Sequence, residues 1–128
     1  MAHYTSIEQS KRLLELGLSS KSADMCYVID YHRSNIYGKD KYNIQIDNYG
    51  TLVQKDDNIP CWSVGALIKV IPDLNDCTLL MARNNGIFGM CFTPLDSGLS
   101  LFDTENETLI DTCVEFILRL LENGYIKK

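Results

Sequence analysis

The sequence predicts an α+β fold, with residues 1–128 forming a single domain in which a mainly antiparallel sheet is covered by three helices. The helices are expected near the N-terminus, in the middle and at the C-terminus, because apolar residues recur at helical spacing near both ends and in a shorter central run. The sheet is indicated by strand-like runs between them and by Asn84-Asn85-Gly86, a strong hairpin signal. A mixed sheet with helices on both faces is the alternative.

The first helix is predicted over residues 5–18, TSIEQSKRLLELGL. Thr5 and Glu8 have the spacing of a capping box, in which each side chain accepts a hydrogen bond from a free backbone N–H group at the start of a helix. Gly17 is suited to ending the helix, because glycine readily adopts the left-handed conformation found there. Residues 18–24, LSSKSAD, then predict a turn, with a single helical turn capped by Ser19 or Ser20 as the alternative.

Two strands are predicted next, at residues 25–32 and 41–47, because both runs are rich in β-branched and aromatic residues. The second run alternates apolar and polar residues, which is typical of a strand with one buried face. The polar residues 33–40 predict a connection that contains Gly38 as a breaker, and residues 51–54 predict a short partner strand. The side chains expected to point inward from the second strand are Tyr42, Ile44 and Ile46.

A middle helix is predicted to begin after Ser63, a good N-cap residue, and to end before Pro72. It is followed by two runs, 77–83 and 86–95, that flank the Asn-Gly turn. Both runs are nearly continuously apolar, so we expect this hairpin to be central in the sheet or covered on both faces. Residues 95–104 then lead into the last helix as a loop.

The last helix is predicted over residues 104–124 and contains the longest apolar stripe of the chain. Thr104 and Glu107 repeat the spacing of a capping box at its start. Gly124 lies where a left-handed residue often ends a helix. The stripe is formed by Leu109, Ile110, Cys113, Val114, Ile117, Leu120 and Leu121.

Charge and composition exclude some classes of function. The formal net charge is −5, which argues against general nucleic-acid binding and against attachment to an anionic membrane, because both depend on clustered lysine and arginine. The N-terminus lacks the apolar core of a signal peptide, and no apolar run is long enough to span a membrane. We therefore expect a cytoplasmic protein.

The cysteines are consistent with that location. They are odd in number, widely spaced and surrounded by apolar residues, and none forms a C-x-x-C pair. Inside a cell such residues remain reduced and pack like small hydrophobic side chains. We expect reduced and mostly buried thiols at Cys26, Cys61, Cys77, Cys91 and Cys113.

Four segments together resemble a family of small uncharacterised proteins from gut Bacteroides-type bacteria and their prophages and conjugative elements. The segments are YTSIEQSKRLLELGL at 4–18, ADM at 23–25, IPCWSVGALIKVIP at 59–72 and LLENGYIKK at 120–128. The third resembles a family pattern Trp-Ser-Leu-Gly-Ala-Leu-Leu, from which Val64 and Ile68 depart conservatively. The resemblance implies a cytoplasmic bacterial or phage accessory protein, and it implies no catalytic residue.

One arrangement of residues suggests an enzyme, a small cysteine-dependent hydrolase. Cys61 would be the nucleophile, His32 its base and Asp30 the residue that orients the base, because Asp30 and His32 would share one face of the predicted strand. A thiol near a helix N-terminus would also have a lowered pKa. Against this reading, Cys61 lies between Pro60 and Trp62, where a packed thiol is the more common case. We therefore expect no catalytic site and keep the hydrolase as the alternative.

We expect no cofactor and no metal site. The two histidines, His3 and His32, are far apart in the sequence, and no two cysteines lie at a metal-binding spacing.

The aromatic residues suggest binding. Tyr27, Tyr31, Tyr37 and Trp62 fall in or near the strand-rich first half and would form a recognition face if exposed, or part of the core if buried. We therefore expect a non-enzymatic protein-interaction module that binds an unknown protein partner. The sequence is also compatible with a homodimer.

Overall fold

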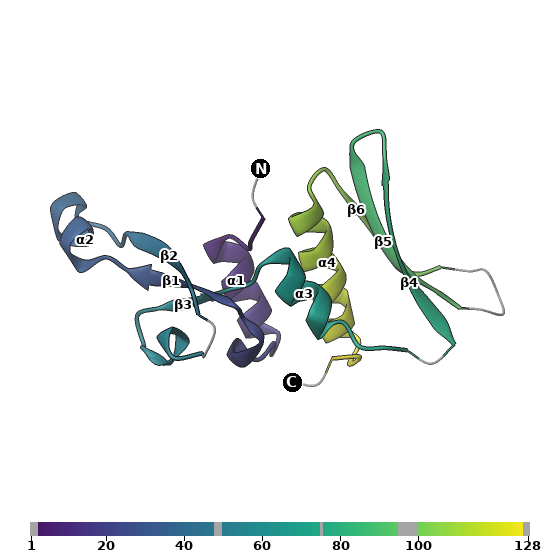
Figure 1. Cartoon of the computed structure of the whole chain (residues 1–128), viewed down its shortest axis with the longest axis horizontal. Helices are drawn as coiled ribbons and strands as arrows, with labels where there is room; N and C mark the ends of the chain where they lie inside the picture. The colour runs from purple at the N-terminus through teal and green to yellow at the C-terminus, as the bar shows by residue number, and fades with distance from the viewer. Residues whose placement is uncertain (1–2, 48–49, 75, 95–99, 127–128) are drawn as a thin grey trace.

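The computed structural model describes residues 3–47, 50–74, 76–94 and 100–126. It confirms the α+β class, with antiparallel pairing throughout the described strands, but it divides the strands between two three-stranded sheets. Helices α1, α3 and α4 lie between the two sheets (Figure 1). The α-helices are α1 (Ile7–Glu15), α2 (Tyr31–Tyr37), α3 (Val64–Val70) and α4 (Leu109–Glu122), and the 3-10 turns are η1 (Ser20–Ser22) and η2 (Leu52–Gln54). The strands are β1 (Met25–Ile29), β2 (Tyr42–Ile46), β3 (Ile59–Cys61), β4 (Cys77–Asn84), β5 (Ile87–Pro94) and β6 (Leu101–Asn106).

The first sheet has the order β2-β1-β3, and β1 ends earlier than predicted. Asp30 leaves the strand because its carboxylate accepts a hydrogen bond from the backbone N–H of Arg33 at 3.0 Å and so caps α2. The predictions of a strand to residue 32 and of a connection over 33–40 are therefore wrong. Gly38 ends α2 with a φ of 68°, a left-handed conformation that glycine adopts without strain.

The second predicted strand is confirmed as β2, but its predicted burial is wrong. β2 is an edge strand, and Ile44 and Ile46 are 36% and 71% exposed. The predicted strand at 51–54 is instead η2, because the buried carboxylate of Asp47 accepts hydrogen bonds from two successive N–H groups at its start. These contacts fold the chain back toward β1 without a further strand.

The second sheet has the order β4-β5-β6 and contains the predicted hairpin. Asn85 and Gly86 have φ angles of 54° and 79°, as a tight two-residue turn requires. The expectation that both hairpin strands are covered is wrong for β4, which is a largely exposed edge strand, whereas β5 is central. The sequence also missed β6, which occupies much of the predicted loop.

Of the three predicted helix starts, one has the expected cap, one is displaced by one residue and one is wrong. Ser63 caps α3 as predicted, accepting a hydrogen bond from the N–H of Ala66 at 3.1 Å. The first capping box is displaced by one residue and joins Ser6 to Gln9. The capping box at Thr104 is wrong, because Thr104 lies in β6 and Thr108 caps α4 instead. Gly124, with a φ of 77°, follows the end of α4 as predicted.

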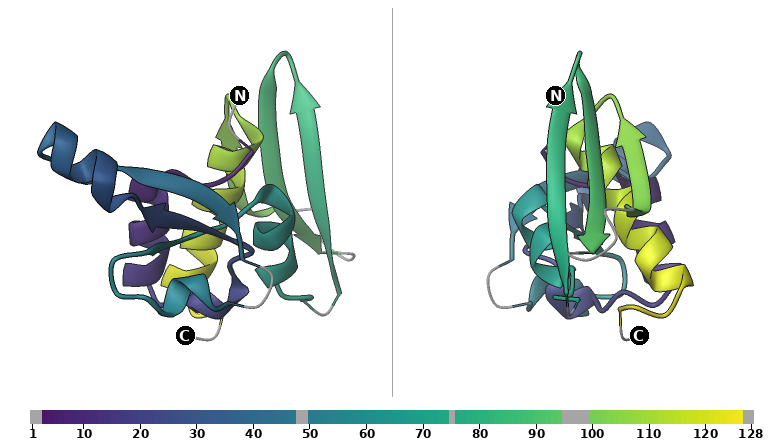
Figure 2. Two further views of the ribbon diagram at one scale, coloured as in Figure 1. Left: turned by 60° about the vertical axis from the view of Figure 1, so that its left-hand side comes forward. Right: turned by 90° about the vertical axis from the view of Figure 1, so that its right-hand side faces the viewer.

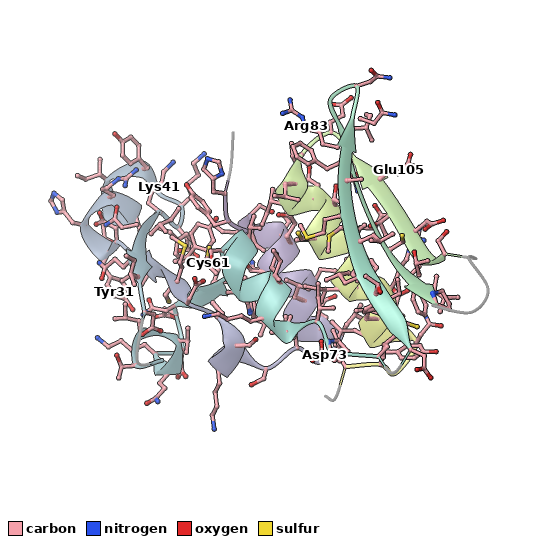
Figure 3. The ribbon with its side chains drawn as sticks, turned by 45° about the vertical axis from the view of Figure 1, so that its right-hand side comes forward. Tyr31, Lys41, Cys61, Asp73, Arg83 and Glu105 are labelled. Atoms are coloured by element: carbon pink, nitrogen blue, oxygen red, sulfur yellow. The ribbon has the colours of Figure 1, made fainter. Side chains whose placement is uncertain are left out.

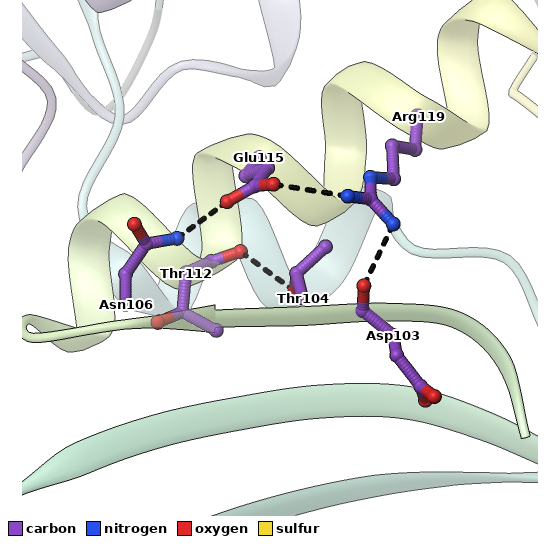
Figure 4. Close-up of polar contacts among 6 residues, drawn as sticks. All are labelled: Asp103, Thr104, Asn106, Thr112, Glu115 and Arg119. Carbon is purple, nitrogen blue, oxygen red and sulfur yellow. Dashed lines mark hydrogen bonds and ion pairs between the residues drawn. The ribbon is translucent and has the colours of Figure 1, made fainter.

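Helix α4 is joined to β6 by polar contacts as well as by packing (Figure 4). The guanidinium of Arg119 donates to the backbone oxygen of Asp103 at 2.7 Å and contacts Glu115 at 3.2 Å. Glu115 also accepts a hydrogen bond from the side chain of Asn106 at 2.5 Å. These contacts fix the helix along the edge strand of the second sheet.

The core is one cluster of buried side chains that draws on both halves of the chain. Leu13 and Trp62 come from the first half, and Phe92 and Phe116 from the second, all between 0% and 2% exposed. Burial of such large side chains is the main stabilising contribution to folding. That the chain folds as a single domain remains a prediction.

Candidate binding site

A cleft lies beside α2, where this helix faces the segment before β3. Its volume is about 650 Å³. A neighbouring hollow of about 520 Å³ shares Ile29, Tyr31, Asp56 and Asp57 with it. We call the larger hollow the α2 cleft; its lining includes Tyr31, Asp40, Tyr42, Asp56, Asp57 and Ile59.

Local hydrogen bonds hold the α2 side of the cleft in place. The second carboxylate oxygen of Asp30 accepts a hydrogen bond from the side chain of Asn43 on β2 at 3.2 Å. The hydroxyl of Ser34 donates to the backbone oxygen of Asp30 at 2.7 Å and accepts from the N–H of Lys41 at 2.9 Å. The short helix is thus tied through Asp30 to β2 and through Ser34 to the residue just before β2.

The opposite side of the cleft depends on one buried asparagine. The side-chain oxygen of Asn58 accepts a hydrogen bond from the N–H of Ile29 at 3.1 Å, and its amide donates to the backbone oxygen of Leu52 at 2.9 Å. Because buried amides need such partners, Asn58 fixes the segment that carries Asp56 and Asp57. The cleft is therefore formed by two anchored segments.

The cleft is negatively charged. Its lining has three aspartates, at 40, 56 and 57, and one lysine, Lys39. The ion pairs found in the described ranges involve other carboxylates, those of Glu15, Glu115 and Glu122. The hydroxyl of Tyr31 donates a hydrogen bond to Asp57, and this bond raises the pKa of Tyr31. The arrangement suits a positively charged group that contacts both carboxylates and aromatic rings.

The four predicted binding aromatics do not form one surface. Tyr31 and Tyr37 are 59% and 63% exposed on α2, as a recognition face requires. Trp62 is fully buried, and its indole N–H donates to the hydroxyl of Ser22 at 2.9 Å. Tyr27 is 8% exposed, and its hydroxyl donates to the backbone oxygen of Thr5 at 2.6 Å. Trp62 and Tyr27 are therefore buried and do not share the exposed surface of Tyr31 and Tyr37, although Tyr27 lines a separate hollow of about 280 Å³.

The residues of the hydrolase alternative are not brought together. Cys61 pairs with Met25 at the beginning of β1, whereas His32 follows the end of β1 and lies exposed in α2. Asp30 caps that helix, and the hydrogen bond from the N–H of Arg33 lowers the pKa of Asp30. Figure 3 shows Tyr31, the neighbour of both residues, well separated from Cys61.

Cys61 itself is a buried, hydrogen-bonded thiol. It is 0% exposed, lies in β3 rather than at a helix start, and donates to the backbone oxygen of Thr5 at 3.5 Å. Burial raises the pKa of the Cys61 thiol, and it raises that of Cys26 and of Cys113 to about 11. A raised pKa leaves little thiolate near neutral pH, and the thiolate is the nucleophilic form.

This burial predicts the pattern of thiol modification in the native protein. At pH 8, iodoacetamide should label only Cys77 and Cys91, which are partly exposed, while Cys26, Cys61 and Cys113 react only in denaturant. In the folded protein a thiol with a pKa of about 11 is roughly 0.1% ionised at pH 8, so we expect a slow reaction that accelerates as the pH rises. Mass spectrometry of the labelled protein measures this, and selective fast labelling of Cys61 would instead support the hydrolase.

Sequence reasoning found two aromatics of this site but missed the acidic residues and Ile36, which is 63% exposed on α2. The available signal is the pair Asp56-Asp57, which stands in the polar run QKDDN at 54–58. No sequence pattern marks Asp40 as a site residue. It lines the cleft because the chain turns at Gly38, after the end of α2.

Comparisons of the chain with models of protein families, with curated proteins and with solved structures found no match. Among the described residues, no group of three histidine, cysteine, aspartate or glutamate side chains could hold a metal ion. None of the described helices is both long and apolar enough to cross a membrane. The interpretation of the site therefore depends on its own geometry and charge.

Proposed function

We propose that this chain is a non-enzymatic protein-interaction module that binds a basic segment of a partner protein through α2 and the α2 cleft. The observation that supports the proposal is the exposure of three large side chains, Tyr31, Ile36 and Tyr37, on a seven-residue helix beside an acidic cleft. Aromatic side chains are enriched at protein interfaces, and exposed aspartates would attract lysine or arginine.

The negative charge of the cleft indicates that the bound segment is basic. A lysine or arginine side chain from the partner would contact Asp40, Asp56 or Asp57 while its aliphatic part packs against Tyr31 or Tyr42. Such surface charges mainly increase the association rate and the specificity, so binding should weaken with added salt. The resemblance to accessory proteins of bacteria and mobile elements, and the five unpaired cysteines, support a cytoplasmic location as part of this proposal.

Site-specific photo-crosslinking in the cells that encode the chain tests this function. Benzoylphenylalanine replaces Tyr37 in one version and Tyr125, 45% exposed, in another. We expect a discrete protein adduct from position 37 and none from position 125. An absence of adducts at position 37, or the same adducts from both positions, would contradict the proposal.

A charge variant tests the role of the cleft. Changing Asp40, Asp56 and Asp57 together to asparagine should reduce the yield of the adduct at least tenfold, because the shape of the cleft is kept and its charge is removed. The matched control changes Asp73→Asn, Glu105→Gln and Glu107→Gln, which alters the net charge equally. Figure 3 shows Asp73 and Glu105 away from Tyr31. Equal losses in both variants would show that overall charge, and not the cleft, drives binding.

A further inference from the structure

The free edge of β4 is the longest unpaired strand edge in the described structure. β4 has eight residues and pairs on one side with β5, and no other described strand lies on its other side. Figure 2 shows the β4–β5 hairpin on the outside of the molecule, with the helices behind it. Unpaired edges of this length are sites at which a further strand can add to a sheet.

The β4 edge is apolar on both of its faces. Leu80 and Met81, which point to opposite faces of the sheet, are 46% and 42% exposed. Natural sheets protect free edges with lysine, proline or inward-pointing charge, and β4 contains a single charged residue, Arg83, near its end. The edge therefore lacks the features that normally prevent pairing.

Hairpin geometry shows which backbone groups the edge offers. In a two-residue hairpin the flanking pair, here Asn84 and Ile87, is hydrogen-bonded, and hydrogen-bonded and non-bonded pairs then alternate along the strands. The N–H and C=O groups of Arg83, Met81, Leu79 and Cys77 consequently point away from β5. These four residues provide the donors and acceptors for an added strand.

We propose that a second copy of this chain pairs with the edge, β4 against β4 in antiparallel orientation, to give a continuous six-stranded sheet about a two-fold axis at Leu80. This register places Leu79 opposite Met81 of the second copy and Cys77 opposite Arg83 of the second copy. It is the one symmetric register in which all four outward-pointing residues of each strand are paired. Leu80 then lies opposite Leu80 of the second copy, on the uncovered face.

Charge favours a second copy as the occupant. The two Arg83 residues lie at opposite ends of the pair, roughly 20 Å apart at about 3.4 Å per residue. The exposed Asp76, which lies in the turn just before β4, is one position beyond the residue opposite Arg83 of the second copy, so each end of the pair carries both an acidic and a basic residue. Pairing of two copies through β6 would instead bring together acidic residues, Asp103 and Glu105. The edge strand β2 has only five residues, so it offers fewer backbone groups for pairing than β4.

This dimer is independent of the proposed function. β4 lies at the opposite end of the molecule from α2, so pairing through it leaves both α2 clefts exposed (Figure 1). An interface made by one strand pair is at the small end of specific interfaces, so we expect a dissociation constant in the micromolar range.

Sedimentation equilibrium of the full chain under reducing conditions tests the dimer. At about 100 μM, the expected mass is twice the 14.5 kDa of one chain. Met81→Pro should return the mass to that of one chain, because proline removes an outward N–H that β5 does not use. A single-chain mass for the parent protein, or a dimeric mass for a folded Met81→Pro, would overturn the proposal.

A crosslinking experiment tests the register without relying on the proline variant. The partly exposed Cys77 and Cys91 are first changed to serine in all versions, because Cys91 lies directly opposite Leu80 within the hairpin. In this background Leu80→Cys should form an intermolecular disulfide on mild oxidation, because directly opposed residues in a non-bonded pair have Cα atoms about 4.5 Å apart, within the range of a disulfide. Ile46→Cys on β2, where the native residue is 71% exposed, is the matched control. We expect crosslinking of the Leu80 variant alone; equal crosslinking of both variants, or of neither, would overturn the proposal.

Discussion

Replacing Trp62 with alanine is expected to lower the free energy of unfolding by about 3–5 kcal/mol, as removal of a large buried aromatic side chain usually does. Trp62 is fully buried, and its backbone N–H and C=O both bond to Thr5, at 3.1 and 2.9 Å. The substitution leaves a cavity where β3 meets the N-terminal segment and η1. Urea denaturation followed by far-UV circular dichroism measures the loss, which is a large share of the roughly 5–15 kcal/mol typical of a domain.

Two variants serve as controls for this prediction. Trp62→Phe keeps most of the ring but removes the donor to Ser22, so we expect a smaller loss, about 1 kcal/mol for the hydrogen bond plus a packing contribution. Tyr37→Ala removes an aromatic side chain that is 63% exposed and should change stability by less than about 0.5 kcal/mol. A loss below about 1 kcal/mol for Trp62→Ala would contradict its assignment to the core.

Replacing Phe116 with alanine is expected to be similarly destabilising, by about 3–5 kcal/mol. Phe116 is fully buried on α4, and its ring lies 5.3 Å from that of Phe92 on β5, measured between ring centres. The substitution removes the main aromatic contact between the last helix and the second sheet. Trp62 is the only tryptophan and lies in the first half of the chain, so its fluorescence reports whether that half unfolds when Phe116 in the second half is changed.

The same experiment tests the prediction of a single domain. If the core is cooperative, the loss of Phe116 lowers the urea midpoint of Trp62 fluorescence and of circular dichroism together. Leu118→Ala, which truncates a half-buried side chain on the same helix, should produce a smaller shift in both signals. A fluorescence midpoint unchanged by Phe116→Ala, with a separate transition in circular dichroism, would show two independently folding units.

Local signals in the sequence predicted much of the secondary structure. The cap at Ser63, the tight turn at Asn85-Gly86 and the left-handed Gly124 were all correct, because each depends on residues that are close neighbours in the chain. The same kind of signal failed where two neighbouring caps competed. Thr104 and Thr108 both precede the apolar stripe. Thr104 lies in β6 because it pairs with Met90 of β5, which leaves Thr108 to cap the helix.

The candidate site was only partly predictable. Tyr31 and Tyr37 were identified as aromatics, but their exposure depends on α2, which begins because Asp30 caps it. Tyr27 and Trp62 have the same composition signal and are buried, because Thr5 and Ser22 satisfy their polar groups. Residue type alone does not distinguish an aromatic side chain in the core from one on a binding surface.

By itself, the sequence determined the α+β class, the positions of three helices and the β4–β5 hairpin, since periodicity, caps and turn residues act over a few positions. The tertiary structure decided which faces are buried, how the strands divide into two sheets and where the acidic cleft forms. These features depend on contacts between distant segments, such as the bonds from Ser63 to Asp24 at 2.5 and 2.9 Å and from Ile29 to Asn58 at 3.1 Å. Burial is a property of the folded chain as a whole, and no local pattern contains it.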